Sequence, residues 1–164
     1  MATDAQAIAR VHVDTWRVAY AHAFPPEKLA SLSVDERAAG WARWFARREP
    51  RATALVAERD ANVIGFASVG PSRDPDADDT VGEVYAIYVV PAEWSRGFGR
   101  RLLHESAAAM RASGFREATL WVLDDNPRAR RAYEAVGWAL DGGEQEDVVL
   151  GDVPVKEVRY RKTL

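Results

Sequence analysis

The sequence predicts an α/β (α+β) fold in which a mixed, mostly antiparallel central sheet is flanked by helices. Two observations lead to this prediction. The chain has 164 residues, the usual size of one domain, so residues 1–164 are expected to form a single domain. Segments whose apolar residues recur at helical spacing also alternate with shorter segments rich in valine, isoleucine and tyrosine. The expected order is two helices, three strands, a helix, a strand, a helix and a last pair of strands.

The N-terminal region is expected to hold the first two helices. Thr3 or Asp4 can cap the first helix, and Phe24-Pro25-Pro26 ends this region. The second helix is expected over residues 34–48, because Ser33 is a good cap and acidic residues occupy the first turn. A polar turn then joins two short apolar segments, which predicts a hairpin.

The remaining elements follow from turn residues and apolar runs. Strands are expected at residues 53–58, 63–69, 81–90 and 118–123, with a last pair at 147–150 and 155–162. One helix is expected to follow the turn at residues 93–99 and to run to about residue 112, where Gly114 closes it. Another helix is expected to start at Asn126-Pro127 and to end at Gly137.

The composition excludes several classes of function. The net charge of −3 gives no indication of a nucleic-acid or membrane partner. The chain has no cysteine, which excludes disulfides, thiolate metal sites and a cysteine nucleophile, and fits a cytoplasmic location. No apolar stretch approaches the roughly 18 residues of a membrane span, and the N-terminus lacks the features of a secretory signal. The histidines are isolated from further ligands, so no metal site is expected.

The most informative stretch joins a strand to a helix through two glycines, Gly97 and Gly99. Glycine lets a ligand approach the main chain closely, and the first N–H groups of a helix attract phosphate. Arg96, Arg100 and Arg101 add positive charge. A simple strand-to-helix connection is the alternative explanation. The phosphate loops of dinucleotide- and nucleoside-triphosphate-binding proteins match this stretch less well.

Residues 83–138 resemble the core of the GNAT N-acetyltransferase superfamily. In that family an (Arg/Gln)-x-x-Gly-x-(Gly/Ala) loop binds the pyrophosphate of coenzyme A, and Gly97 and Gly99 take its glycine positions. Trp94 stands where the family has arginine or glutamine, and Arg96 is a candidate to compensate. A second family pattern, Asn-x-x-Ala-x-x-x-Tyr-x-x-x-Gly-(Phe/Trp), is met by Asn126, Ala129, Tyr133, Gly137 and Trp138. Family members usually have a short strand before the first helix, whereas only three residues precede Asp4 in this sequence.

The resemblance implies an acyl-CoA N-acyltransferase fold and an acetyl-CoA-dependent N-acetyltransferase. The acetyl group would pass from acetyl-CoA to a primary amine of a small molecule or a protein by direct attack in a ternary complex. The residues expected to bind acetyl-CoA are Val89, Val90, Trp94, Ser95, Arg96, Gly97, Phe98, Gly99, Arg100, Arg101, Asn126 and Tyr133. The main-chain N–H of Val89 or Val90 would stabilise the developing oxyanion, whereas Asn126 has a second interpretation as a helix cap.

Two residues are expected to move protons. Tyr133 is the candidate acid that protonates the departing thiolate, although a tyrosine on an apolar helix face more often belongs to the core. Glu83 is the candidate base, acting directly or through a water; the alternative is a strand-end carboxylate in solvent. The resemblance also favours a homodimer.

The acceptor site is expected at the aromatic residues of the first helix. Trp16, Tyr20 and Phe24 lie at four-residue intervals, a spacing that fits a pocket wall or a packed helix face. With Glu83 and Tyr85 they form the expected substrate-binding set. The acidic loop at residues 74–79 would either attract a cationic acceptor or be a solvated, mobile segment. An acetyl-CoA-binding sensor or assembly module and a nucleotide-binding fold are the alternative functions.

Overall fold

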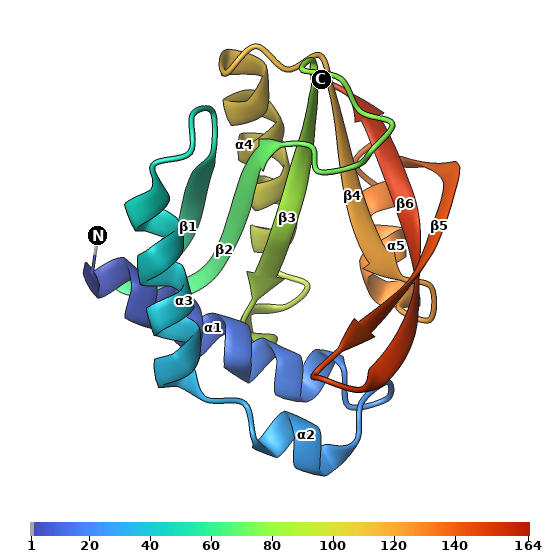
Figure 1. Cartoon of the computed structure of the whole chain (residues 1–164). Helices are drawn as coiled ribbons and strands as arrows, with labels where there is room; N and C mark the ends of the chain where they lie inside the picture. Colours follow the sequence, from blue (N-terminus) through green and yellow to red (C-terminus); the bar gives the residue numbers. More distant parts are fainter. Residues whose placement is uncertain (1) are drawn as a thin grey trace.

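The computed structural model describes residues 2–164, and it places all six strands of this range in one sheet (Figure 1). The strands are β1 (Thr53–Arg59), β2 (Asn62–Pro71), β3 (Val81–Val89), β4 (Glu117–Leu123), β5 (Ala139–Val149) and β6 (Val153–Thr163). Their order in the sheet is β1-β2-β3-β4-β6-β5. Only β3 and β4 run parallel, and the other neighbouring pairs are antiparallel. The expected mixed, mostly antiparallel sheet is confirmed.

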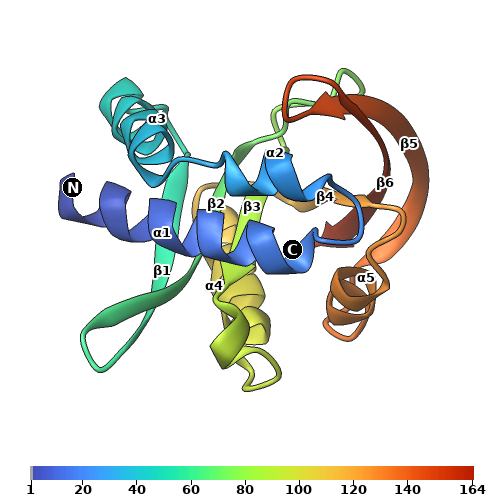
Figure 2. The same ribbon diagram turned by 90° about the horizontal axis from the view of Figure 1, so that it is seen from below.

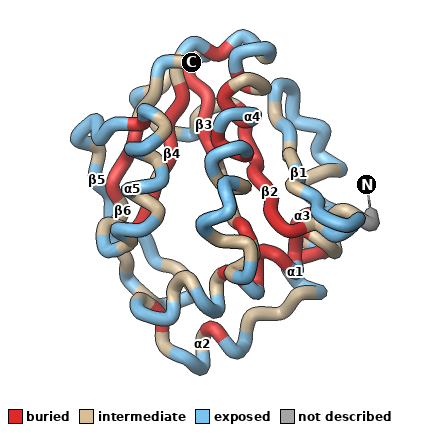
Figure 3. Tube along the Cα trace, turned by 180° about the vertical axis from the view of Figure 1, so that it is seen from behind, coloured by how far each residue is buried: buried red, intermediate tan, exposed pale blue. Residues whose placement is uncertain are grey.

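Helices cover both faces of this sheet. Helices α1 (Ala2–Ala19), α2 (Pro26–Ala30) and α3 (Val34–Arg47) lie on one face, and α4 (Phe98–Ala112) and α5 (Pro127–Glu134) lie on the other (Figure 2). A short 3₁₀ turn, η1 (Pro91–Glu93), follows β3. The buried residues follow the central strands and the helix faces turned towards them (Figure 3). Within residues 2–164 no helix is long and apolar enough to cross a membrane.

Most expected elements are present, and three differ from the sequence-based expectation. Helix α1 already includes Ala2, so Thr3 and Asp4 lie in its first turn and do not precede it as caps, and the described residues hold no strand before it. The short helix α2 was not expected. Strand β5 begins at Ala139 rather than at residue 147, because its mostly exposed first half is held by pairing with β6 and not by an apolar face. By contrast, Ser33 caps α3 as expected, accepting a hydrogen bond from the Glu36 amide.

The parallel pair β3 and β4 separates soon after it forms. Only Val81–Glu83 pair with Glu117–Thr119. Beyond that point β3 stays paired with β2 and β4 stays paired with β6, so the two halves of the sheet diverge (Figure 1). The divergence opens the sheet between two strands that are each anchored along their other edge.

The acidic loop between β2 and β3 is attached to the sheet through Arg159 of β6. The guanidinium of Arg159 lies 3.2 Å from Asp74, 2.7 Å from Asp76 and 2.9 Å from Asp141. Asp74 also accepts a hydrogen bond of 2.8 Å from the indole of Trp121, and its side chain is only 8% exposed. Two acids of the loop are therefore neutralised within the fold, and the expectation of a solvated segment is wrong for Asp74.

This ion-pair cluster leads to a stability prediction. We expect Arg159→Met to lower the free energy of unfolding by about 3 kcal/mol, because it leaves the Asp74 carboxylate buried without its cation. Urea unfolding measures the loss. Arg161→Met is the matched control: Arg161 also pairs with Asp141 but is more exposed, at 27% of its side chain, so we expect a loss below about 1 kcal/mol.

The same cluster predicts a pH dependence of stability. Hydrogen bonds from Arg159 lower the pKa of Asp76 below its ordinary value of 3.8. A carboxylate whose pKa is lower in the folded state stabilises the fold at every pH above its unfolded-state pKa, here 3.8. This contribution is lost as the pH falls through 3.8 and below. The acid-induced loss should therefore be shallower in Arg159→Met. Equal free energies of unfolding for Arg159→Met and Arg161→Met at neutral pH would contradict the role given to the Arg159 ion pairs.

Candidate active site

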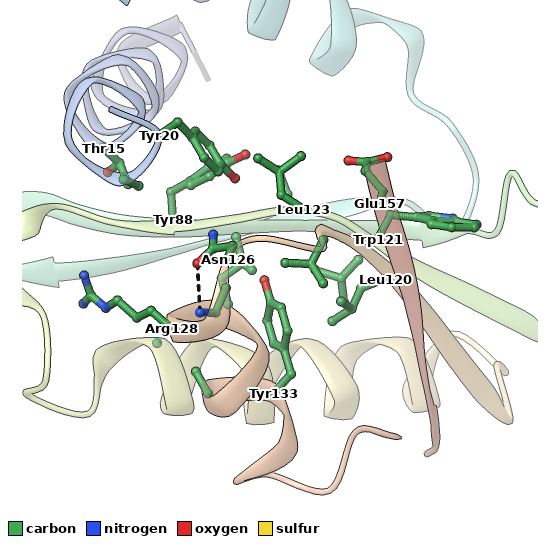
Figure 4. A pocket seen from close by; sticks show the side chains of 18 of the residues that line it. Thr15, Tyr20, Tyr88, Leu120, Trp121, Leu123, Asn126, Arg128, Tyr133 and Glu157 are labelled. Carbon is green, nitrogen blue, oxygen red and sulfur yellow. Dashed lines mark hydrogen bonds between the residues drawn. The ribbon is translucent and has the colours of Figure 1, made fainter. Parts of the chain in front are cut away.

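A cleft with a volume of about 1230 Å³ occupies the opening between β3 and β4. Its walls come from α1, β3, the turn before α4, β4, α5 and β6. The cleft reaches both faces of the sheet: Tyr133 and Arg128 approach it from the side of α5, and Tyr20, Tyr88 and Glu157 approach it from the other side (Figure 4). Two ligands entering from opposite faces would therefore meet between the strands.

The glycine turn forms one end of the cleft. Gly97 is the N-cap of α4 with φ +91°, and Ser95 before it also has a positive φ of 62°. The Arg101 amide donates to the Gly97 carbonyl, which leaves the amides of Phe98, Gly99 and Arg100 without helical partners. No acidic residue occupies this first turn. The exposed amides and the positive end of α4 fit a phosphate group.

The space in front of these glycines is open. A Cβ atom added at Gly97 or at Gly99 would meet no atom within 4 Å, and both residues line the cleft. Neither glycine is therefore required by close packing within the protein. Gly97 is favoured by its left-handed backbone, and Gly99 leaves room for a group that approaches the main chain from the cleft.

The structure places eight of the twelve residues expected to bind acetyl-CoA along the cleft. These are Val89, Trp94, Ser95, Gly97, Gly99, Arg100, Asn126 and Tyr133. The other four, Val90, Arg96, Phe98 and Arg101, are not among its lining residues. The Val90 amide donates to the Ile64 carbonyl at 2.9 Å, and Arg96 lies 3.6 Å from Glu93. Phe98 packs against the apolar cluster of Ala67, Val89 and Leu102.

The main chain of Val89 faces the opening. Its carbonyl accepts hydrogen bonds from the Trp94 indole at 2.6 Å and from the Thr15 hydroxyl at 3.2 Å. In a strand the N–H and C=O of one residue point to the same edge, so the Val89 amide also faces β4 across the gap. Of the two amides considered as oxyanion donors, only that of Val89 is aimed into the cleft.

Tyr133 and Asn126 come from α5 and its cap. Tyr133 projects its hydroxyl towards the gap between the strands, and burial raises the pKa of this phenol (Figure 4). Within residues 2–164 no hydrogen bond fixes that hydroxyl, which leaves it available to a ligand. The Asn126 side chain accepts from the Ala129 amide at 3.1 Å, so its interpretation as a helix cap is confirmed.

The aromatic residues of α1 form a wall that is both packed and exposed to the cleft. The Trp16 and Phe24 rings stack with centroids 5.8 Å apart, and Tyr20 meets both edge-on. All three line the cleft. The hydroxyl groups of Tyr20 and Tyr88 interact, and burial raises the pKa of each phenol. The two interpretations of this spacing are therefore compatible: one packed cluster supplies the wall.

Glu83 lies at the far end of the cleft and is paired with Arg73. Its carboxylate accepts from the Arg73 amide at 2.9 Å and from the guanidinium Nε at 3.1 Å, with a further close contact from Nη2. The Glu83 side chain is 3% exposed, whereas that of Arg73 is 67% exposed. Arg73 also covers the ring of Tyr85, whose hydroxyl donates to the Pro71 carbonyl. Glu83 is therefore buried, contrary to its alternative interpretation as a solvated strand end.

Sequence reasoning missed Glu157, Tyr88, Trp121 and Arg128, all of which line the cleft. Glu157 is half-buried and accepts from Gln145 at 2.7 Å. Burial raises its pKa, and the nearby Asp147 contributes to this shift. Charged residues alternate with apolar ones along residues 157–161 of β6, a pattern typical of a strand with one solvent-facing side, so the sequence carried no signal that other elements cover this face.

Across residues 2–164 no group of three or more histidine, aspartate or glutamate side chains is placed to hold a metal ion. The chemistry available in the cleft comes from phenols, carboxylates and exposed main-chain amides.

A glycine turn with exposed amides beside a gap between diverging parallel strands, with a phenol aimed into the gap, is the arrangement expected of an acyl-CoA-dependent N-acyltransferase. The family model described as "Acetyltransferase (GNAT) family" matches residues 7–138. The chain therefore belongs to the GNAT acetyltransferase family and is an N-acetyltransferase that uses acetyl-CoA.

Individual relatives agree with this assignment. The N-acetyltransferase YuaI of Bacillus subtilis is 35% identical over 152 residues, which cover 92% of this chain and 85% of the relative. Mycothiol acetyltransferase of Cellulomonas flavigena is 34% identical over 148 residues, but the match covers 86% of this chain and only 40% of that longer protein. The crystal structure of the PaiA N-acetyltransferase of Thermoplasma acidophilum with coenzyme A superposes with a TM-score of 0.77 at 19% identity, covering 99% of this chain and 94% of that one.

The open space before the glycine turn leads to a binding prediction. We expect Gly99→Ala to weaken acetyl-CoA binding about tenfold, because the methyl group occupies the space that a phosphate needs. The variant should fold at least as stably as the parent, since alanine is the better helix former. Calorimetric titration with acetyl-CoA and thermal unfolding measure the two effects.

Gly40→Ala provides the matched control. Gly40 lies in α3, where an added Cβ would meet only the end of the Arg43 side chain at 3.9 Å. It should gain similar stability and bind acetyl-CoA normally. Unchanged affinity in a folded Gly99→Ala variant would remove the glycine turn from the coenzyme site.

Proposed function

We propose that this chain moves the acetyl group of acetyl-CoA to a primary amine by direct attack, with both substrates bound together in the cleft. The observation that carries the proposal is the opening of the sheet, which lets one ligand enter from the side of α5 and another from the side of α1. Residues 1–164 would act as one domain, supported by the single sheet that unites the strands. The cytoplasmic location stays a prediction.

The glycine turn and the Val89 amide would position the donor. Acetyl-CoA supplies the acetyl group as a thioester, whose C–S bond breaks as the new C–N bond forms. The amides of residues 98–100 would hold the diphosphate, and the Val89 amide would stabilise the negative charge that develops on the carbonyl oxygen. These groups are fixed by α4 and β3, so little reorganisation accompanies the reaction.

Tyr133 would return a proton to the departing sulfur. Burial raises its pKa, so the phenol keeps its proton at neutral pH. The coenzyme thiol, with a pKa of about 8.5, is the stronger acid, so the phenol would donate its proton in a hydrogen bond that stabilises the sulfur as the C–S bond breaks. Tyr133 and the Val89 amide line the same gap between the strands. A thioester whose carbonyl lies beside that amide would therefore place its sulfur near Tyr133, which supports this role.

Glu83 would accept the proton that the ammonium loses before it attacks. The Glu83 carboxylate is paired with Arg73 in the structure. To act as a base it would have to exchange the exposed Arg73 side chain for the amine or for a bridging water. Glu157 is the second candidate base, because it faces the acceptor side of the cleft and its pKa is already raised.

The amine acceptor would occupy the side of the cleft bounded by Trp16, Tyr20, Phe24, Glu83 and Tyr85. Aromatic and acidic groups suit the alkyl chain and the ammonium group of a small amine or of a protein amine. An acetyl-CoA sensor without catalysis is the weaker alternative, since a free phenol and carboxylates line the cleft and the relatives are acetyltransferases. Of the four residues expected to bind coenzyme but placed outside the cleft, Phe98 contributes only its main-chain amide, and Val90, Arg96 and Arg101 have no role in this proposal.

The proton-donor role of Tyr133 predicts a loss of turnover. We expect Tyr133→Phe to lower kcat about a hundredfold, because the thiolate then departs without a positioned acid. Thiol release with a panel of amines measures kcat, and calorimetry should give an acetyl-CoA affinity within about threefold of the parent. If the parent releases no thiol with any amine while binding acetyl-CoA tightly, the sensor alternative replaces the enzyme.

The two candidate bases predict different pH profiles. We expect Glu83→Gln to lower kcat/KM about a hundredfold, and Glu157→Gln to lower it less than about tenfold without changing the acidic limb of the profile. Both substitutions remove one charge at nearly constant volume. An acidic limb above the ordinary carboxylate range that disappears in Glu157→Gln would assign the base to Glu157, because burial raises the pKa of that residue.

A further inference from the structure

Trp94 cannot contribute a charge to the coenzyme site, and its single donor is already used. It stands at the first position of the diphosphate-binding motif, three residues before Gly97. Its indole N–H donates to the Val89 carbonyl at 2.6 Å. The ring therefore presents only its apolar face near the glycine turn, and any side-chain charge that binds a diphosphate there comes from another residue.

Arg128 of α5 covers that face. Its guanidinium carbon lies 3.3 Å from the centroid of the Trp94 ring, which is the closest cation–aromatic approach among the described residues. Figure 4 shows Arg128 extending from the first turn of α5 away from Tyr133. Both Arg128 and Trp94 line the cleft together with Ser95 and Gly97. A residue distant in sequence thus brings a positive charge beside the glycine turn.

The charge of Arg128 is not neutralised within the fold. In the described range 2–164 no carboxylate lies within ion-pair distance of it, and partial burial lowers its pKa. Arg96, the residue first considered as a substitute, lies 3.6 Å from Glu93, and Glu93 also binds Arg59 at 2.9 Å. Arg128 can therefore bind an incoming anion without first breaking an ion pair. Arg96 would first have to leave Glu93.

We propose that Arg128, stacked on Trp94, is the cation that binds the coenzyme diphosphate in this chain, a proposal that rests on the coenzyme site of the proposed function. A guanidinium can bind two phosphate oxygens at once, and stacking on a ring leaves its N–H edge free to do so. The indole N–H bond to Val89 fixes the ring, and the ring fixes the guanidinium. Arg128 is thus a coenzyme-binding residue, and Trp94, at the position where the family motif has arginine or glutamine, is the positioning residue that holds it.

Calorimetric titration of four proteins tests this proposal: the parent, Arg128→Gln, Arg131→Gln and the double variant Trp94→Arg/Arg128→Gln. Arg131→Gln is the matched control, since Arg131 lies on the same helix, is exposed and does not line the cleft. The ligands are coenzyme A, dephospho-coenzyme A, which keeps the diphosphate but lacks the 3′-phosphate, and S-acetylpantetheine, which has neither.

We expect Arg128→Gln to weaken binding of coenzyme A and dephospho-coenzyme A by the same factor, about tenfold, and to leave S-acetylpantetheine unaffected. Arg131→Gln should bind all three like the parent. The affinity of the double variant for coenzyme A and dephospho-coenzyme A should return to within about threefold of that of the parent, because an arginine at position 94 restores a positive charge beside the glycine turn.

The outcomes separate the two proposals. Equal coenzyme affinity in the parent and in Arg128→Gln overturns the role of Arg128 and leaves the proposed function intact. A loss seen with coenzyme A but not with dephospho-coenzyme A also overturns it, by assigning Arg128 to the 3′-phosphate. A parent that binds neither coenzyme form removes the coenzyme site itself, and with it the proposed function.

Discussion

The site depends on the early separation of two parallel strands. Strands β3 and β4 pair over only three residues each, and the remaining main-chain groups on the facing edges must find other partners or stay open to a ligand. The Val89 carbonyl has found other partners, since Trp94 and Thr15 donate to it. The Val89 amide beside it stays open to a ligand. An unpaired strand edge, costly in an ordinary sheet, becomes a ready set of donors for a carbonyl-containing substrate.

The separation is stable because each strand is anchored along its other edge and the far half of the sheet is tied across the opening. Arg159 of β6 binds Asp74 and Asp76 of the loop that precedes β3, so an ion-pair cluster joins the two halves of the sheet where the strands meet. Glu83 binds Arg73 in the same loop. Two of the four acids of this loop, Asp74 and Asp76, therefore tie the loop to β6 beside the cleft.

The sequence predicted the fold well because its signals were local. The cap at Ser33, the two glycines before α4 and the Asn126-Pro127 start of α5 each act through the backbone within a few residues. The site was predicted only in part. Eight coenzyme-binding candidates line the cleft because they follow the glycine turn and the α5 motif. Glu157 and Arg128 depend on which segments cover them, and that information lies in contacts between residues far apart in sequence.

The charges along the cleft differ between its two sides. The proposed coenzyme side has the positive end of α4, Arg100 and the unpaired Arg128, whereas the proposed acceptor side has Glu157 and the ion pair between Glu83 and Arg73. A diphosphate and an ammonium group would each be attracted to the side of opposite charge. Each ligand would then extend inwards between the strands, so the thioester and the amine would meet where Tyr133 and the Val89 amide face the same space. Electrostatics can thus orient both substrates before any catalytic group acts, and the opening of the sheet sets the point at which they react.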